Sequence, residues 1–151
     1  MSLILIVTRC MLMVLPVVYM GFIWYFSSRP SHSVIDLGFY DSFIKESLHL
    51  VEFAILYLLW VLALLARGRL TPSGNRFAII LSVAYAFIDE FHQSFIPSRS
   101  ASAIDLVKDM AGIAVVWYWV SRAYFREDDS KTGKFLRGIM DRLSPKEGAK
   151  R

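Results

Sequence analysis

Cysteine and charge are both scarce in this chain. It has one cysteine, Cys10, so no intrachain disulfide can form and a secreted disulfide-stabilised scaffold is excluded. Only 20% of the 151 residues are charged, whereas 56% are hydrophobic, which excludes a disordered or collagen-like chain. Sequence repeats with a period of about 20–50 residues are also absent, which excludes a repeat architecture. What remains is the composition expected when lipid surrounds most of the chain.

Net charge is absent from most of the sequence and is concentrated at its C-terminal end. Residues 122–151 carry nine Lys or Arg and five acids, which accounts for the whole net charge of +4, whereas residues 1–121 carry eight of each sign. A basic tail on a neutral, apolar body suits the anionic inner surface of a membrane better than nucleic acid. We therefore divide the chain into a transmembrane domain, 1–121, and a basic cytoplasmic tail, 122–151, and expect lipid partners and no nucleic acid.

Four apolar stretches are each long enough to cross about 30 Å of hydrocarbon as a helix. They cover residues 7–26, 47–66, 77–95 and 101–119. We expect the first to be retained and not cleaved as a signal peptide, because Pro16 and Tyr19 interrupt it and no A-x-A-like site follows. The predicted fold class is therefore all-α, an integral membrane four-helix bundle.

Arginines in a short loop predict the orientation of this bundle. Arg67, Arg69 and Arg76 lie between the second and third spans with no acid among them, and the basic tail follows the fourth span. Short cytoplasmic loops are enriched in Lys and Arg, so both segments are expected on the cytoplasmic side. The sequence therefore predicts a multi-pass protein with both termini in the cytoplasm.

The basic tail contains an apolar pattern with helical spacing. Its apolar positions are Phe135, Leu136, Ile139, Met140 and Leu143, and charged residues fill the other face. This pattern favours a short amphipathic helix on the inner membrane surface. A frayed, solvated tail is the alternative, because a helix of this length is marginal by itself.

Polar residues with helical spacing mark one end of three predicted spans. In chain order they are Lys45, His49 and Glu52; Asp89, Glu90, His92 and Gln93; and Ser102, Asp105 and Asp109, followed by Gly112. Steps of three and four residues place most members of each set on one helical face. All three sets are expected at the outer end of the bundle, where Lys108 can pair with Asp105.

The predicted depth of these residues suggests a function. Glu52 follows Lys45 by seven residues and Glu90 precedes Pro97 by seven, which places each carboxylate about 10 Å inside its helix end. Ionisable groups at such depth cost at least about 2.5–3.5 kcal/mol unless they meet partners or water. They are therefore expected to form a polar pocket. The structural alternative is that they only neutralise one another and fix the helix register.

Three ordered motifs in this region resemble those of the VanZ-like membrane proteins. Residues 24–30 read WYFSSRP, residues 49–53 read HLVEF, and residues 89–105 read DEFHQSFIPSRSASAID. The resemblance covers roughly residues 20–115 and leaves out the basic tail. It implies a bacterial plasma membrane protein of the cell envelope and a link to glycopeptide resistance of the teicoplanin type, without supplying a reaction.

The depth argument and the resemblance select the same residues. Those expected to carry acid–base chemistry are His49, Glu52, Glu90, His92 and Asp105. Those expected to bind substrate are Asp89, Gln93, Arg99, Ser102 and Asp109. Arg99 could hold a phosphate or carboxylate bidentately, so the predicted ligand is an anionic lipid or a lipid-linked cell-envelope precursor.

Several functions stay open at this point. Carboxylates and imidazoles on facing helices suit an enzyme that uses general acid–base catalysis. A small proton-coupled transporter acting as a homodimer and a non-catalytic factor that binds antibiotic or precursor would use the same pocket. No cofactor is predicted. No metal site is predicted either, because H-x-x-E and E-x-H are loose spacings and basic residues nearby oppose a cation.

Overall fold

The computed structural model describes residues 3–29, 41–68, 70–97, 102–126 and 131–143, and in the second helix it describes side chains from Leu50 onward. These residues form helices and no strand, as the sequence predicts. The helices are α1 (Leu3–Ser27), α2 (Asp41–Arg67), α3 (Pro72–Gln93), α4 (Ala103–Phe125) and α5 (Lys131–Leu143). The predicted tail helix is therefore present as α5.

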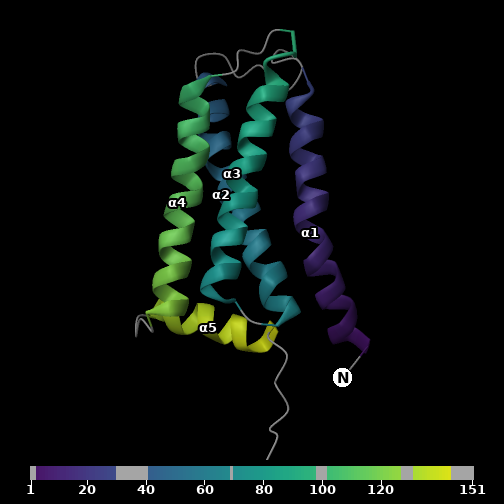
Figure 1. Ribbon diagram of the computed structural model, residues 1–151, viewed down its shortest axis with the longest axis vertical. Helices are drawn as coiled ribbons and strands as arrows, with labels where there is room; N and C mark the ends of the chain where they lie inside the picture. Colours follow the sequence, from purple (N-terminus) through teal and green to yellow (C-terminus); the bar gives the residue numbers. More distant parts are fainter. Residues whose placement is uncertain (1–2, 30–40, 69, 98–101, 127–130, 144–151) are drawn as a thin grey trace, which may run out of the picture.

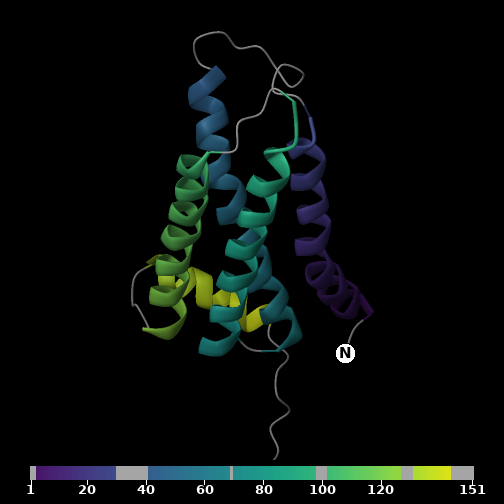
Figure 2. The same cartoon turned by 45° about the horizontal axis from the view of Figure 1, so that its top comes forward.

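The four long helices run side by side with alternating direction, and α5 crosses one end of them (Figure 1). α1 and α3 finish at the end where α2 and α4 begin. We call this end, marked by Ser27 and Gln93, the polar end. The opposite end carries the α2–α3 connection and α5, and we call it the basic end. Figure 2, in which the top of the bundle comes forward, shows the beginning of α2 set behind that of α4.

Side-chain caps set the boundaries of α3 and α4. Thr71 precedes α3, where its hydroxyl accepts a hydrogen bond from the backbone N–H of Gly74 at 3.0 Å, and Pro72 occupies the first turn. Ser102 caps α4 in the same way, accepting from the backbone N–H of Ile104 at 3.2 Å. Such caps satisfy N–H groups that have no partner within the helix. α4 therefore begins at Ala103, two residues later than predicted.

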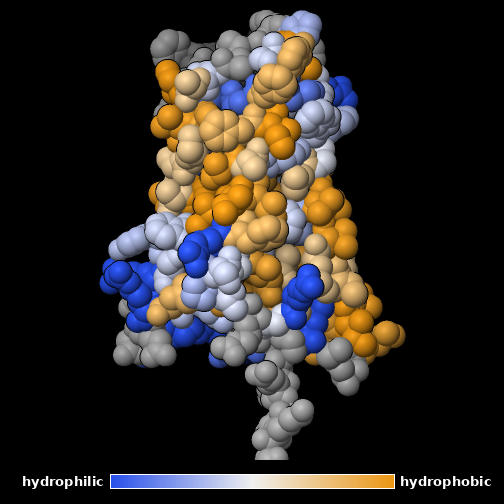
Figure 3. Space-filling view, in the orientation of Figure 1, coloured by the Kyte–Doolittle hydropathy of each residue, from blue (hydrophilic) through white to orange (hydrophobic). Residues whose placement is uncertain are grey.

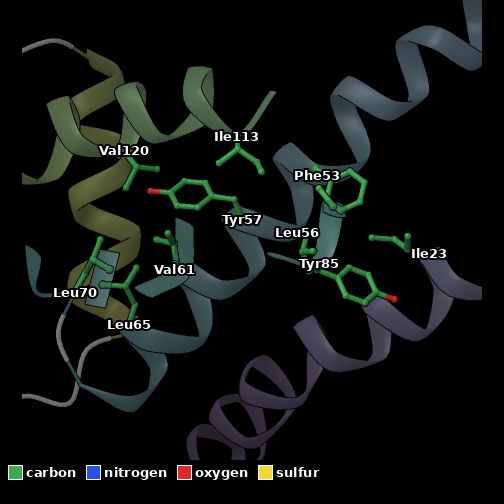
Figure 4. Packing of buried hydrophobic residues seen from close by; sticks show 12 residues of the cluster. Ile23, Phe53, Leu56, Tyr57, Val61, Leu65, Leu70, Tyr85, Ile113 and Val120 are labelled. Atoms are coloured by element: carbon green, nitrogen blue, oxygen red, sulfur yellow. The ribbon is translucent and has the colours of Figure 1, made fainter. Parts of the chain in front are cut away.

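The hydrophobic core follows α2 from Phe53 to Leu65 (Figure 4). Buried residues of α2 include Phe53, Tyr57 and Val61, and they recur with the spacing of one helical face. They pack in one cluster with Ile23 of α1 and Ile113 of α4. Because α2 contacts α1, α3 and α4, it is the central helix of the bundle.

Among the described residues, two helices are apolar and long enough to cross a membrane. They are α1, Leu3–Ser27, and the Leu50–Arg67 part of α2. α3 and α4 are less apolar, because α3 contains Asp89 and Glu90 and α4 contains Lys108. Membrane crossing by α3 and α4 therefore stays a prediction. Figure 3 shows a broad band of hydrophobic residues across the middle of the bundle, with hydrophilic residues toward the basic end.

Gly112 allows α2 and α4 to pack backbone against backbone. A Cβ atom added at Gly112 would lie 2.0 Å from the carbonyl oxygen of Leu50 and 3.0 Å from its carbonyl carbon. Real Cβ atoms do not approach backbone this closely. Glycine is therefore required here, as in other close helix contacts of membrane proteins.

We predict that Gly112→Ala destabilises the protein by about 1–3 kcal/mol, because the added methyl group forces α2 and α4 apart. Thermal unfolding in detergent measures the effect. The matched control is Gly21→Ala in α1, where an added Cβ meets nothing within 4 Å. Equal stability of the Gly112→Ala variant and the wild type would contradict the close packing.

Candidate functional site

A buried hydrogen-bond network connects α1 with α3 at the polar end. The side-chain amide of Gln93 donates through Nε2 to Asp89 Oδ2 at 2.6 Å and lies 3.1 Å from Ser27 Oγ. All three side chains are buried, and Asp89 is only 1% exposed. Asp89 and Gln93 are one helical turn apart on α3, so one amide reaches both the carboxylate and the neighbouring helix.

An aromatic contact joins the same two helices beside this network. The rings of Trp24 and His92 stack with their centroids 3.8 Å apart and their planes 23° from parallel. His92 is half-buried, and its Nδ1 atom is buried without a hydrogen-bond partner in the described part of the chain. His92 therefore lies against α1, while Gln93 donates a hydrogen bond to Ser27.

Glu90 connects α3 with the beginning of α4. Its Oε2 atom accepts a hydrogen bond from the backbone N–H of Ser102 at 3.1 Å. A carboxylate at the N-terminus of a helix is also stabilised by the helix dipole. Glu90 thus has a structural role at the point where the chain enters α4, in addition to any role in chemistry.

Glu52 lies deeper in the bundle, near two tyrosines. Its carboxylate interacts electrostatically with the hydroxyl groups of Tyr19 and Tyr85, and Asp89 interacts with Tyr85 as well. The Tyr85 hydroxyl donates to the backbone carbonyl of Met20 at 2.6 Å. Polar groups of α1, α2 and α3 therefore continue from the polar end toward the interior of the bundle.

The polar residues of α4 divide into two groups. Asp105 accepts a hydrogen bond from Lys108 at 3.0 Å, which is the predicted ion pair, and both side chains are partly exposed. Asp109 is fully buried. It lies one turn before Gly112 on the face that contacts α2.

The carboxylates lie at different depths. α2 begins at Asp41, so Glu52 is about 16 Å inside that helix at 1.5 Å per residue. Glu90 is only about 5 Å from the end of α3 at Gln93. The predicted common depth of about 10 Å is therefore wrong, because α2 starts earlier and α3 ends earlier than the sequence pattern indicates.

Some predicted site residues lie outside the described part of the structure. Arg99 belongs to the residues that the structure does not describe, and the side chains of Lys45 and His49 are not described either. The structure brings Asp89, Gln93 and the neighbouring His92 to one place. The predicted pairing of His49 with Glu52 and the contact of Arg99 with a ligand stay predictions.

The sequence prediction missed the contribution of α1. Ser27 and Trp24 contact the predicted residues of α3, and Tyr19 lies near Glu52. Two of these had a signal in the sequence, since Ser27 and Trp24 belong to the motif at residues 24–30. Tyr19 had a weaker one, as a polar interruption of an apolar stretch.

The chemistry available to the site is hydrogen bonding and proton transfer. Buried carboxylates and an imidazole in a low-dielectric environment can exchange protons with a bound molecule. In the described ranges, no group of three or more His, Cys, Asp or Glu side chains is arranged to hold a metal ion.

Comparisons with known proteins agree with the motifs. A family model described as VanZ/LLP1 matches residues 9–124, a range that includes every predicted site residue. Comparison with curated proteins and with solved structures gave no match. The family match covers well over half of the chain, which confirms the resemblance seen in the sequence. The chain belongs to the VanZ/LLP1 family, and this family together with the two apolar helices indicates a membrane protein.

Proposed function

We propose that the protein binds a membrane lipid or a lipid-linked cell-envelope precursor at the polar end and exchanges protons with it. The observation that carries this proposal is the burial of Asp89 in a network that joins α1 to α3. Burying a carboxylate among apolar helices is costly, and such groups in membrane proteins usually serve a substrate or proton path.

The surroundings of the network support a lipid as the ligand. Large apolar side chains at the polar end are exposed, among them Phe22 and Tyr25 of α1 and Phe91 of α3. In a membrane, lipid chains would cover these apolar side chains. The headgroup of such a lipid would then lie level with His92 and Asp89. The predicted contact of Arg99 with a phosphate or carboxylate group belongs to this proposal. So does an effect on glycopeptide resistance in a bacterial plasma membrane.

Proton-coupled transport is the second candidate. The observation that favours it is the series of ionisable groups at increasing depth, from Glu90 through Asp89 to Glu52, with Tyr85 between the last two. Such a series would let protons move between helices. A factor that only binds its ligand would need the same polar groups but no proton transfer.

We predict that Glu52→Gln and Glu90→Gln fold normally but lose activity, because an amide keeps the shape and hydrogen bonding of the carboxylate and cannot exchange its proton. The measurement is mass spectrometry of the lipids that copurify with each variant. If the protein is an enzyme, a phosphorylated or lipid-linked species should accumulate on the variants and not on the wild type.

The matched control for this comparison is Asp141→Asn, an exposed carboxylate on α5 at the basic end. It should copurify the same lipids as the wild type. If the same lipids copurify with the wild type and with all variants, the hypothesis that the protein is an enzyme is contradicted. A loss of proton-driven flux in vesicles containing Glu52→Gln would then assign the protein to the transporters.

We further predict that reporter fusions at Ser73 and Ser98 report the cytoplasm and the outside, respectively. The reason is the group of arginines at the basic end, including Arg67 and Arg76, which favours the cytoplasmic side. Fusions with the reversed pattern would show that the polar end faces the cytoplasm. The ligand would then have to come from the inner leaflet.

A further inference from the structure

Negative charge dominates the described residues at and near the polar end. In the described ranges 50–52, 89–97 and 102–109 the chain carries five acids, Glu52, Asp89, Glu90, Asp105 and Asp109. Lys108 is the one Lys or Arg in these ranges, so negative charges exceed positive ones by four. A purely anionic ligand would be repelled by this excess, whereas a ligand with a positive group would be attracted.

The described cations nearest this region already have partners. Lys108 pairs with Asp105 at 3.0 Å. The guanidinium group of Arg29 lies 4.6 Å from the centre of the Tyr25 ring and hydrogen-bonds the Tyr25 hydroxyl. Neither contact brings a positive charge to Asp89.

Of the two carboxylate oxygens of Asp89, one has a hydrogen-bond partner among the described residues and one has none. Its Oδ2 atom accepts from Gln93, but its Oδ1 atom is buried and has no hydrogen-bond partner among the described residues. A buried carboxylate oxygen without a donor is unfavourable. The same side chain interacts electrostatically with Tyr85, as Glu52 does.

The ring of Trp24, which stacks on His92 one helical turn from Asp89, can also receive a cation. Trp24 is 43% exposed although one face of its ring stacks on His92. An indole ring attracts an ammonium group through its negative face, and the attraction grows where water is excluded.

We propose that the lipid bound at the polar end carries a primary ammonium group, which donates a hydrogen bond to Asp89 Oδ1. This inference rests on the proposed function and adds the chemistry of the headgroup. An ammonium group supplies three donors and a positive charge, which match an acidic region with an unfilled carboxylate acceptor.

The ligand enters between α1 and α3. On this side the hydrogen bond between Ser27 and Gln93 lies beside Asp89, and the Trp24–His92 stack is its neighbour. Separating Ser27 from Gln93 would open the side of Asp89 that faces α1.

The test is native mass spectrometry of the full chain in detergent with defined lipids. Phosphatidylethanolamine is compared with its N-acetylated form, which keeps the chains and the phosphate but lacks the ammonium group, and with phosphatidylglycerol. We expect phosphatidylethanolamine to bind about tenfold more tightly than either of the others. Soluble phosphoethanolamine should bind far more weakly, because it lacks the apolar chains.

A variant then assigns the effect to one side chain. In Asp89→Asn the preference for phosphatidylethanolamine over its N-acetylated form should disappear, while Asp141→Asn should keep it. The comparison of lipids on the wild type decides the question even if Asp89→Asn does not fold.

Different failures have different meanings. Equal affinity of the wild type for all three lipids would overturn the ammonium inference and leave lipid binding intact. Equal binding of soluble phosphoethanolamine and the lipid would also overturn it, because the ligand would then be a soluble amine. Binding of none of the lipids would overturn the proposed function itself.

Discussion

The carboxylate of Asp89, buried between apolar helices, is the constraint on which the polar end of this protein depends. In such surroundings a charged or polar group must find hydrogen bonds within the protein or from a bound ligand, because the hydrocarbon chains around the helices supply none. Gln93 meets this need on one side of Asp89 and at the same time contacts Ser27. The position of the end of α1 therefore follows from the hydrogen bonding of a residue on α3.

Close backbone packing is the second constraint, and it acts on the other pair of helices. Gly112 brings α4 against the Leu50 carbonyl of α2. This contact holds Asp109, which lies one turn from Gly112 on α4, against α2. It also fixes the position of Glu52, two residues after Leu50, along the axis of α4. The two constraints together fix α1 against α3 and α4 against α2, although the residues in contact come from distant parts of the chain.

The sequence predicted the helices and the polar stripe of α3 well, because both follow from local spacing. It predicted Asp89, Gln93 and the Lys108–Asp105 pair, whose members lie three or four residues apart. The contribution of Ser27 and Trp24 was missed, because contacts between α1 and α3 span more than sixty residues of sequence. The prediction that the carboxylates lie at equal depth was wrong for another reason. Helix ends depend on caps and turns, and apolar patterns locate these only approximately.

The measurement that tests this account most directly is the coupling between Ser27 and Gln93. A double-mutant cycle with Ser27→Ala, Gln93→Ala and the double variant, followed by equilibrium unfolding in mixed detergent micelles, isolates that interaction from the loss of the Asp89 contact. A real interhelical hydrogen bond predicts a coupling of about 0.5–1.5 kcal/mol, the range found for polar contacts between membrane helices. Strictly additive effects would show that Ser27 and Gln93 do not interact, and would contradict the attachment of α1 to α3 through the buried network.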